Sequence, residues 1–238
     1  MKTRECLSVK TRIAALDWAG IAASLDATGA ANTGPLLTPG ECADLAAGYD
    51  QPGLFRSHVV MARHGYGRGE YRYYADPLPE VVAGLREALY PRLAPIANAW
   101  AETLGEERRF PAEHAEFLAG CHAAGQRKPT PLQLRYGPGD YNCLHQDLYG
   151  AEVFPLQMVV LLSGDFTGGE FVLTEQRPRM QSRAEVVPMA LGEAVVFATR
   201  HRPVRGSRGA YRVALRHGVS RVRSGSRQTL GIIFHDAA

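Results

Sequence analysis

The sequence is poor in cysteine, and its cysteines do not form a recognisable metal or disulfide pattern. Cys6, Cys42, Cys121 and Cys143 are far apart, and no CxxC pair occurs. This argues against a thiolate zinc site and against the disulfide framework of a small secreted domain. We therefore expect a reducing compartment.

Long apolar runs are also missing. The first residues, MKTRECLSVKTRIAALDW, carry charges where a signal peptide needs an apolar segment, and no run of 18 apolar residues occurs anywhere. From this we expect a cytoplasmic protein without membrane contact. As to its oligomeric state, we expect either a monomer or a homodimer.

Charge is scarce overall but unevenly distributed. Charged residues make up 21% of the chain, and the formal net charge is +3. Between Arg177 and Arg227, however, twelve arginines stand against two acidic residues. This half of the chain would attract a polyanion such as nucleic acid, although arginine-rich surfaces also occur without that function.

The length of the chain predicts one structural domain. With 238 residues, 45% of them hydrophobic, it can bury one substantial core. We expect a mainly helical region over residues 1–125, with a β-hairpin near 54–75, packed on a second region, the core, over residues 126–238.

Apolar residues at helical spacing predict helices over residues 13–25 and 79–104, and Thr38-Pro39 is typical of a helix start. Pro91 and Pro95 should break or kink the second of these helices.

From Thr130 onward, short β-rich runs separated by turns replace the helical pattern. The runs are PLQLRYG, FPLQMVVLLS, GGEFVLTE, AEVVPM, GEAVVFAT, YRVALRHGV and RQTLGIIFH. They favour an antiparallel sandwich or jelly-roll barrel over alternating βα units, so the fold class is α+β.

A candidate metal motif lies in YGPGDYNCLHQD, residues 136–147. If Leu144 lies in a strand, His145 and Asp147 project from the same face and can reach one ion. His114 and Glu116 have the same spacing, but they lie in a helical stretch where residues i and i+2 diverge. Two histidines and one carboxylate are the ligands that bind non-haem Fe(II) with open positions, so a distal histidine is needed.

His217 is the preferred distal histidine, because Arg227 and Thr229 follow it at ten and twelve residues. These two side chains share a strand face, and a guanidinium with a hydroxyl beside it is able to hold a dicarboxylate end-on. His201 is the rival, because HRPVRGSR echoes the later motif. No apolar strand follows its arginine, and we interpret His201 as a solvated or substrate-facing residue in an arginine-rich turn.

Four ordered motifs between Leu132 and Phe234 resemble the Fe(II)/2-oxoglutarate-dependent dioxygenase superfamily. They are YxPGxxxxxHxD, GDFTGGEF, GEAVVF and HxVxxVxxGxRxT. The first is similar to AlkB-like nucleic-acid demethylases, and the second to prolyl hydroxylases. YNCLHQDLYG with FVLTEQRPRMQSR resembles a bacterial branch predicted to act on damaged nucleic acid.

The resemblance implies a double-stranded β-helix core, a cupin-like jelly roll, with the N-terminal helices packed on one sheet. His145, Asp147 and His217 would be the iron ligands, with Fe(II), 2-oxoglutarate and O₂ as cofactors. Arg227 and Thr229 would hold the distal carboxylate of 2-oxoglutarate, and Tyr136 would be a further contact. The implied reaction couples decarboxylation of 2-oxoglutarate to succinate with C–H hydroxylation or oxidative demethylation.

The sequence departs from AlkB proteins at two positions. Where they have an asparagine and a second arginine, this chain has Leu134 and Ile233. Base demethylation is therefore predicted less strongly than the general enzyme class, and the substrate is a nucleic-acid base, a protein side chain or a small molecule.

The predicted hairpin carries candidate substrate contacts. Arg68, Tyr71 and Tyr73 interleave charge with rings, which suits stacking on a base or binding a peptide, although tyrosines in a twisted hairpin also cap a core.

Two other classes of function stay open on the sequence. A jelly-roll sensor would bind metal or 2-oxoglutarate without turnover. A zinc hydrolase fits less well, since zinc sites more often use three histidines or a His₂Glu set.

Overall fold

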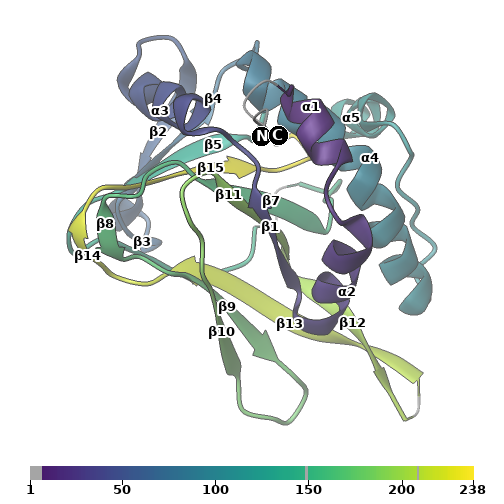
Figure 1. The fold of residues 1–238 in the computed structure, drawn as a ribbon. Helices are drawn as coiled ribbons and strands as arrows, with labels where there is room; N and C mark the ends of the chain where they lie inside the picture. The colour runs from purple at the N-terminus through teal and green to yellow at the C-terminus, as the bar shows by residue number, and fades with distance from the viewer. Residues whose placement is uncertain (1–6, 148–149, 208) are drawn as a thin grey trace.

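A computed structural model describes residues 7–147, 150–207 and 209–238. Two β-sheets form the centre of the molecule, and helices from the N-terminal half lie along one side of them (Figure 1). The predicted α+β class with a double-stranded β-helix core is confirmed.

The helices are short except for one. They are α1 (Val9–Ala14), α2 (Trp18–Thr28), α3 (Pro39–Ala47), α4 (Glu80–Thr103) and α5 (His114–Ala123), with the single-turn 3₁₀ helices η2 (Gly48–Asp50) and η3 (Met61–Arg63). The helix predicted over residues 13–25 is divided, because Asp17 caps a new helix by accepting a hydrogen bond from the Gly20 amide. The start predicted at Thr38-Pro39 is confirmed by a capping box between Thr38 and Glu41.

Pro91 and Pro95 were expected to break or kink this helix, and the break is wrong, since α4 continues through both residues. Each proline costs about 3 kcal/mol in a helix interior. Burial of an apolar face on the sheet offsets this cost, as Leu85, Leu89 and Leu93 are all fully buried in the main core.

The larger sheet has seven strands in the order β1-β11-β7-β15-β5-β4-β2. Their bounds are β1 (Ala30–Pro35), β2 (Phe55–Val60), β4 (Glu70–Tyr74), β5 (Leu132–Tyr136), β7 (Leu156–Leu161), β11 (Glu193–Ala198) and β15 (Arg227–Ile232). The strands β2 and β4 form the hairpin predicted near residues 54–75, and β1 is a strand that the helical expectation for this region missed. The helices α2 and α4 contact β1, β11 and β15, so the N-terminal helices cover this sheet.

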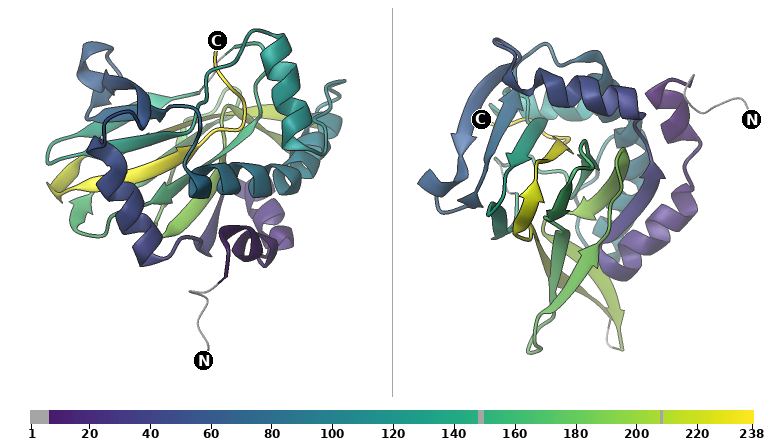
Figure 2. Two further views of the ribbon diagram at one scale, coloured as in Figure 1. Left: turned by 90° about the horizontal axis from the view of Figure 1, so that it is seen from above. Right: turned by 60° about the vertical axis from the view of Figure 1, so that its left-hand side comes forward.

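The smaller sheet runs in the order β10-β9-β13-β6-β3, with β12 also paired to β13. Its strands are β3 (Gly67–Arg68), β6 (Tyr141–His145), β9 (Phe171–Gln176), β10 (Arg183–Val187), β12 (His201–Gly206) and β13 (Gly209–Val219), and β8 (Phe166–Gly168) pairs separately with β14 (Val222–Gly225). Two hairpins, β9–β10 and β12–β13, extend away from the body of the molecule (Figures 1 and 2).

The alternation of side chains along β15 separates core from cavity. Leu230 and Ile232 belong to the main core, whereas Arg227, Thr229 and Gly231 line the cavity between the sheets. A period of two along a strand produces this division. Arg227 and Thr229 therefore both face the inside of the barrel.

No helix within the described ranges combines the length and the apolar character that crossing a membrane requires.

Candidate active site

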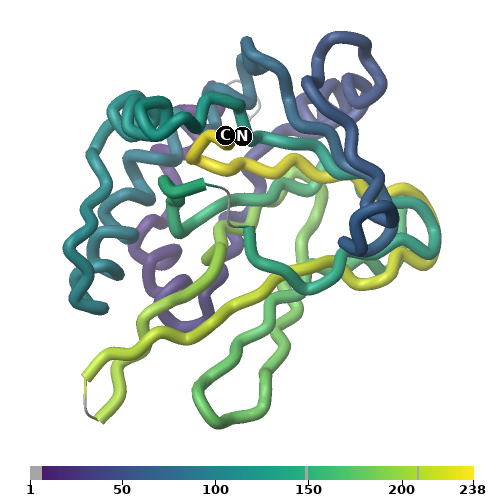
Figure 3. The backbone as a smooth tube through the Cα atoms, turned by 180° about the vertical axis from the view of Figure 1, so that it is seen from behind, coloured from purple at the N-terminus to yellow at the C-terminus, as the bar shows by residue number. Residues whose placement is uncertain are grey.

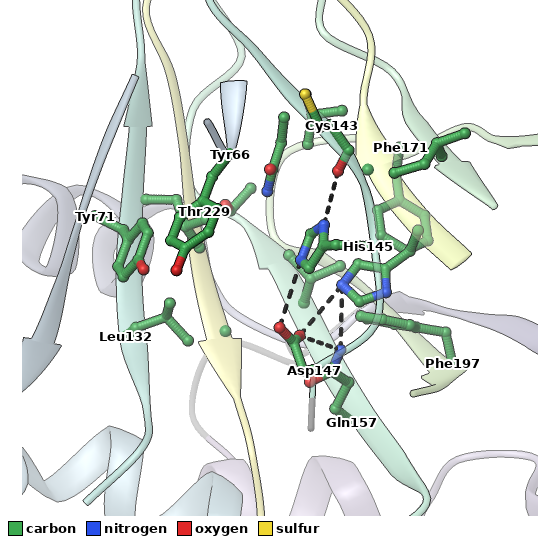
Figure 4. A pocket seen from close by; sticks show the side chains of 18 of the residues that line it. Tyr66, Tyr71, Leu132, Cys143, His145, Asp147, Gln157, Phe171, Phe197 and Thr229 are labelled. Atoms are coloured by element: carbon green, nitrogen blue, oxygen red, sulfur yellow. Dashed lines mark hydrogen bonds and ion pairs between the residues drawn. The ribbon is translucent and has the colours of Figure 1, made fainter. Parts of the chain in front are cut away.

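Two distant segments place three metal-binding side chains together. His145 is the last residue of β6 and Asp147 follows it, while His217 lies in β13. The ladder between these antiparallel strands sets His217 opposite His145. One potential ligand atom from each of the three side chains lies within 4.8 Å of the others (Figure 4).

The geometry of this triad suits one ion. The Nε2 atom of His145 lies 3.4 Å from Oδ1 of Asp147, and Nε2 of His217 lies 3.2 Å from Oδ2. Adjacent ligands of an octahedral ion bound at about 2.1 Å are about 3 Å apart. The separations are therefore close to those of three ligands on one face of an ion.

The backbone and neighbouring rings orient both imidazoles. The carbonyl oxygen of Cys143 lies 2.8 Å from Nδ1 of His145 and can accept a hydrogen bond from it. With the proton on Nδ1, Nε2 is left to bind a metal. The ring of His217 packs 4.7 Å from that of Phe197 and 6.1 Å from that of Phe171, measured between centroids. The rings thus fix His217 in place while its Nε2 faces Asp147.

The electrostatics of the triad favour the metal-binding protonation state in two of its three side chains. Burial acts to raise the pKa of Asp147, but hydrogen bonds and charge interactions with His145 and His217 hold it well below its usual range. Burial lowers the pKa of His217. Burial also acts to lower the pKa of His145, but the Asp147 carboxylate outweighs it and raises this pKa. Asp147 is therefore held ionised and His217 neutral, which are the forms that bind a cation, whereas a metal would have to compete with a proton for His145.

Gln157 of β7 supports the triad, and sequence reasoning missed it. Its Nε2 donates to Oδ2 of Asp147 at 2.8 Å and lies 3.3 Å from Nε2 of His217. The signal was present in the sequence, because Gln157 is the single polar residue in VFPLQMVVLL. Such an outer contact fixes the orientation of a ligating carboxylate.

Arg227 is a buried cation that lacks an anionic partner within the described part of the chain. It is 2% exposed, and its Nε and Nη1 atoms have no hydrogen-bond partner there. Its guanidinium carbon lies 5.7 Å from the centre of the Tyr136 ring and 5.9 Å from that of Phe166. Burial lowers the pKa of Arg227. A buried, unneutralised guanidinium is costly, so its presence points to an anionic ligand.

The second glycine of the GGEF motif makes room for this arginine. Gly169 has φ of 67°, and a Cβ atom there would come within 2.8 Å of Cδ of Arg227. Only glycine adopts this conformation without strain and also leaves the space that the arginine occupies.

Thr229 and Tyr136 lie near Arg227 in the same cavity. The strand register pairs Arg227 with Tyr136, and Thr229 with Leu134, across β15 and β5. Both Thr229 and Tyr136 are buried, and both line the cavity. Burial raises the pKa of Tyr136, so its hydroxyl remains protonated.

One cavity of about 380 Å³ joins the triad to the buried arginine. Its volume falls within the range of about 300–1,000 Å³ typical of small-molecule sites. The triad, Arg227, Thr229 and Tyr136 all line it. The donor set of the triad fits a divalent iron, and the unpaired guanidinium fits the far carboxylate of a dicarboxylate.

Of the three predicted substrate contacts, the structure brings two to the cavity. Tyr71 and Tyr73 of β4 line it, together with Tyr66. Figure 4 shows Tyr66 and Tyr71 on the side away from His145 and Asp147. Arg68 does not line the cavity, and its exposed side chain lies 3.7 Å from the Asp140 carboxylate.

The two competing histidines are placed elsewhere. His201 lies in β12, a strand and not the expected turn, and it is not part of the triad. His114 is buried in α5, where its Nε2 lies 2.8 Å from the Phe234 carbonyl oxygen. Two pairs of residues have the i, i+2 spacing, but only His145 and Asp147 have both side chains at the candidate metal site.

Solved structures share the fold. A 2OG-Fe(II) oxygenase family oxidoreductase from Burkholderia pseudomallei is 19% identical, with a TM-score of 0.55 over 93% of each chain. A prolyl hydroxylase from Trichoplax adhaerens is 12% identical, with a TM-score of 0.56 over 98% of this chain and 93% of its own. A prolyl-4-hydroxylase from Pseudomonas putida is 15% identical, with a TM-score of 0.52 over 93% and 99%.

Curated relatives are much more similar in sequence. Two uncharacterized proteins of Mycobacterium tuberculosis, from strains CDC 1551 and H37Rv, are each 54% identical over 165 residues, 68% of this chain and 71% of theirs.

A family profile assigns the chain to an enzyme class. It describes the Oxygenase-NA family as an oxygenase catalysing oxidative methylation of damaged DNA, and it matches residues 69–237, more than half of the chain. Together with the shared fold, this confirms the predicted class, a 2-oxoglutarate-dependent Fe(II) oxygenase that uses Fe(II), 2-oxoglutarate and O₂. The chain therefore belongs to the Oxygenase-NA family.

Proposed function

We propose that the protein oxidises a C–H bond of a nucleic-acid base at an Fe(II) held by His145, Asp147 and His217. The outcome is hydroxylation, or demethylation where the oxidised carbon is a methyl group on nitrogen. In this proposal Arg227 and Thr229 bind the distal carboxylate of 2-oxoglutarate, and Tyr136 is a further contact.

The observation that carries the proposal is that the triad and the buried guanidinium of Arg227 line one cavity. The triad has an ionised carboxylate beside two imidazoles, and Arg227 has a buried guanidinium without an anion in the described residues. The triad is a ligand set that suits Fe(II), and the far carboxylate of 2-oxoglutarate would supply an anion for Arg227.

The bound iron would supply oxidation of a substrate C–H bond, coupled to decarboxylation of 2-oxoglutarate. The chain itself has three tasks. His145, Asp147 and His217 hold three positions on one side and leave the others open. Arg227 orients the co-substrate, and the rings of Phe171 and Phe197 exclude water behind His217.

The wall of tyrosines supports a base as the substrate. Tyr66, Tyr71 and Tyr73 line the cavity, and Tyr66 is 50% exposed. Aromatic side chains at the entrance of a site stack on bases, and a duplex base would have to be flipped out to reach the iron. The family description names damaged DNA, which agrees with this substrate class.

A protein side chain or a small molecule is the second candidate. Leu134 and Ile233 line the cavity at the positions where AlkB-like demethylases carry an asparagine and a second arginine. The apolar surface that they provide would suit an aliphatic side chain as well as a base.

Formation of succinate from 2-oxoglutarate tests the proposal. With Fe(II), O₂ and a methylated single-stranded oligonucleotide, the wild-type protein should form succinate and change the mass of the oligonucleotide. His145→Ala should abolish both. Turnover that survives His145→Ala would overturn the assignment of the iron site, and binding of 2-oxoglutarate without turnover of any substrate would indicate a sensor. Oxidation of a peptide but not of the oligonucleotide would select the second candidate.

A further inference from the structure

A second cleft lies next to the iron site and takes no part in holding iron or 2-oxoglutarate. It has a volume of about 640 Å³, and its walls are the C-terminal half of α4, residues 106–110, residues 150–155 and the base of the β12–β13 hairpin. Figure 3 shows the C-terminal end of α4 beside this hairpin, and α4 contacts β12 directly.

The charged groups of this cleft are mostly cationic. Arg108, Arg200 and Arg212 line it, and Glu106 is the one carboxylate among its described lining residues. Arg108 is paired with the Glu152 carboxylate, so Arg200 and Arg212 are the cations left to bind an anion. Arg212 donates to Glu106 at 2.7 Å, but both side chains are substantially exposed, so this ion pair contributes little and can exchange for another anion.

Arg200 has no side-chain hydrogen bond or ion pair with the residues that the structure describes, and it is exposed on the rim of the cleft. Burial lowers the pKa of the adjacent His201, and the charges of Arg200 and Arg212 lower it further. Arg200, unpaired within the described residues, and the exchangeable Arg212 therefore offer positive charge to an anion at this cleft.

The cleft is tied to the iron site by Gln146, the residue between two of the triad. Its side-chain Nε2 donates to the carbonyl oxygens of Leu215 at 2.8 Å and of Arg200 at 3.2 Å. Gln146 lines the iron cavity, and Arg200 lines the cleft. The side chain of Gln146, which is adjacent to the candidate metal ligands, therefore links the wall of the iron cavity to the wall of the cleft.

The remaining lining is apolar. Ala97, Trp100, Leu104 and Phe110 form this part of the wall. Trp100 is held by a hydrogen bond from its indole N–H to Asp26 at 2.6 Å, which fixes the ring. A wall with guanidinium groups on one side and fixed aromatic carbon on the other suits a phosphate attached to a sugar.

We propose that this cleft binds the phosphodiester backbone of a single nucleic-acid strand next to the base that enters the iron cavity, with Arg200 and Arg212 as the phosphate contacts. This inference rests on the proposed function, because it takes nucleic acid as the substrate. Bases beyond the one in the cavity must follow the surface, and the arginine-lined cleft offers the strand a charged path there.

The test is the salt dependence of binding to a fluorescein-labelled, single-stranded DNA oligonucleotide, measured by fluorescence anisotropy without turnover. Arg200→Gln and the double variant Arg200→Gln/Arg212→Gln are compared with Arg92→Gln, which removes an exposed arginine of α4 outside the cleft. Thermal unfolding midpoints show that each variant is folded.

Each lost phosphate contact should flatten the plot of log K against log salt by about 0.7, and should raise Kd about fivefold to tenfold at low salt. The double variant should show both effects at about twice the size on a logarithmic scale, and Arg92→Gln should show neither. Equal losses in all variants, or no loss in the cleft variants, would overturn the proposal.

Two further outcomes distinguish the cleft proposal from an acidic protein partner and from the proposed oxidation of a base. Displacement of the DNA by a polyglutamate peptide, with the same loss in Arg200→Gln, would assign the cleft to an acidic protein and overturn the nucleic-acid partner. Because binding is measured without chemistry, the absence of base oxidation would contradict the proposed function while leaving the result on the cleft unaffected.

Discussion

The imidazole of His217 faces that of His145 across the ladder between β13 and β6, with 4.2 Å between the ring centroids. The metal site therefore exists only when these two strands pair. We expect His217→Ala to weaken Fe(II) binding at least about 100-fold, measured by anaerobic titration, because it removes a ligand and not merely a supporting contact. His201→Ala removes the rival histidine and should leave iron affinity unchanged. If His201→Ala weakened Fe(II) binding and His217→Ala did not, His201 would be the distal ligand instead.

When 2-oxoglutarate is absent, the protein should be less stable with Arg227 than with an apolar residue at this position. Arg227→Met replaces a buried, unneutralised charge with an apolar side chain, so the free energy of unfolding should rise by about 1–3 kcal/mol. The stabilisation by 2-oxoglutarate, about 2.7 kcal/mol at a hundred times its Kd, should disappear. Thermal unfolding with and without 2-oxoglutarate measures both effects.

Arg135→Met is the matched control for this variant. Arg135 lies on the neighbouring strand β5 and pairs with both Glu70 and Asp50. Its loss should not raise the stability and should not affect stabilisation by 2-oxoglutarate. If both variants behave alike, Arg227 is not a co-substrate contact.

Gly169→Ala should raise the KM for 2-oxoglutarate about tenfold or more, because its Cβ atom would displace the side chain of Arg227. Gly34→Ala is the control. Gly34 has a similar φ of 70°, but a Cβ atom there meets nothing within 4 Å. Both variants should lose about 1–2 kcal/mol of stability through backbone strain, and only Gly169→Ala should alter the KM. Steady-state kinetics distinguish the two.

Gln157→Leu should weaken Fe(II) binding about 10-fold to 100-fold, since the Asp147 carboxylate loses the amide that orients it. The comparison is Gln133→Leu, which removes a second buried amide that donates to the Leu45 carbonyl away from the site. Both substitutions should change stability to a similar extent. Equal iron affinities in the two variants would show that Gln157 has no role in positioning the ligand.

His114 should make the protein less stable in acid. Burial and, to a lesser extent, the charge of Arg86 lower its pKa to about 4, against the opposing effects of the Phe234 carbonyl, Asp236 and Glu87. The unfolded chain, with an ordinary pKa of about 6.5, binds the proton more readily, so stability is lost as the pH falls from about 6.5 toward 4.

The loss from this one group is about 3 kcal/mol below pH 4. His114→Gln should remove that part of the pH dependence, measured by urea unfolding at pH 7 and pH 4.5. If the free energy of unfolding fell equally between pH 7 and pH 4.5 in His114→Gln and in the wild type, His114 would not be the source of this pH dependence.

The sequence by itself determined most strands of the core and the alternation of faces along them, whereas the strand that carries His145 was an assumption. A period of two places His145 with Asp147, and Arg227 with Thr229, because successive side chains on a strand alternate. The apolar runs and turns from residue 130 onward similarly predicted the β-rich core, since local pattern decides where strands form.

Only the tertiary structure decided which distant segments meet. His217 and not His201 reaches Asp147 because of the pairing between β6 and β13, which no local pattern encodes. Packing of α4 on the sheet likewise carried that helix through two prolines that local propensity would break. The same long-range contacts brought Gln157 to the triad and kept Arg68 outside the cavity, because both depend on the register of strands far apart in the chain.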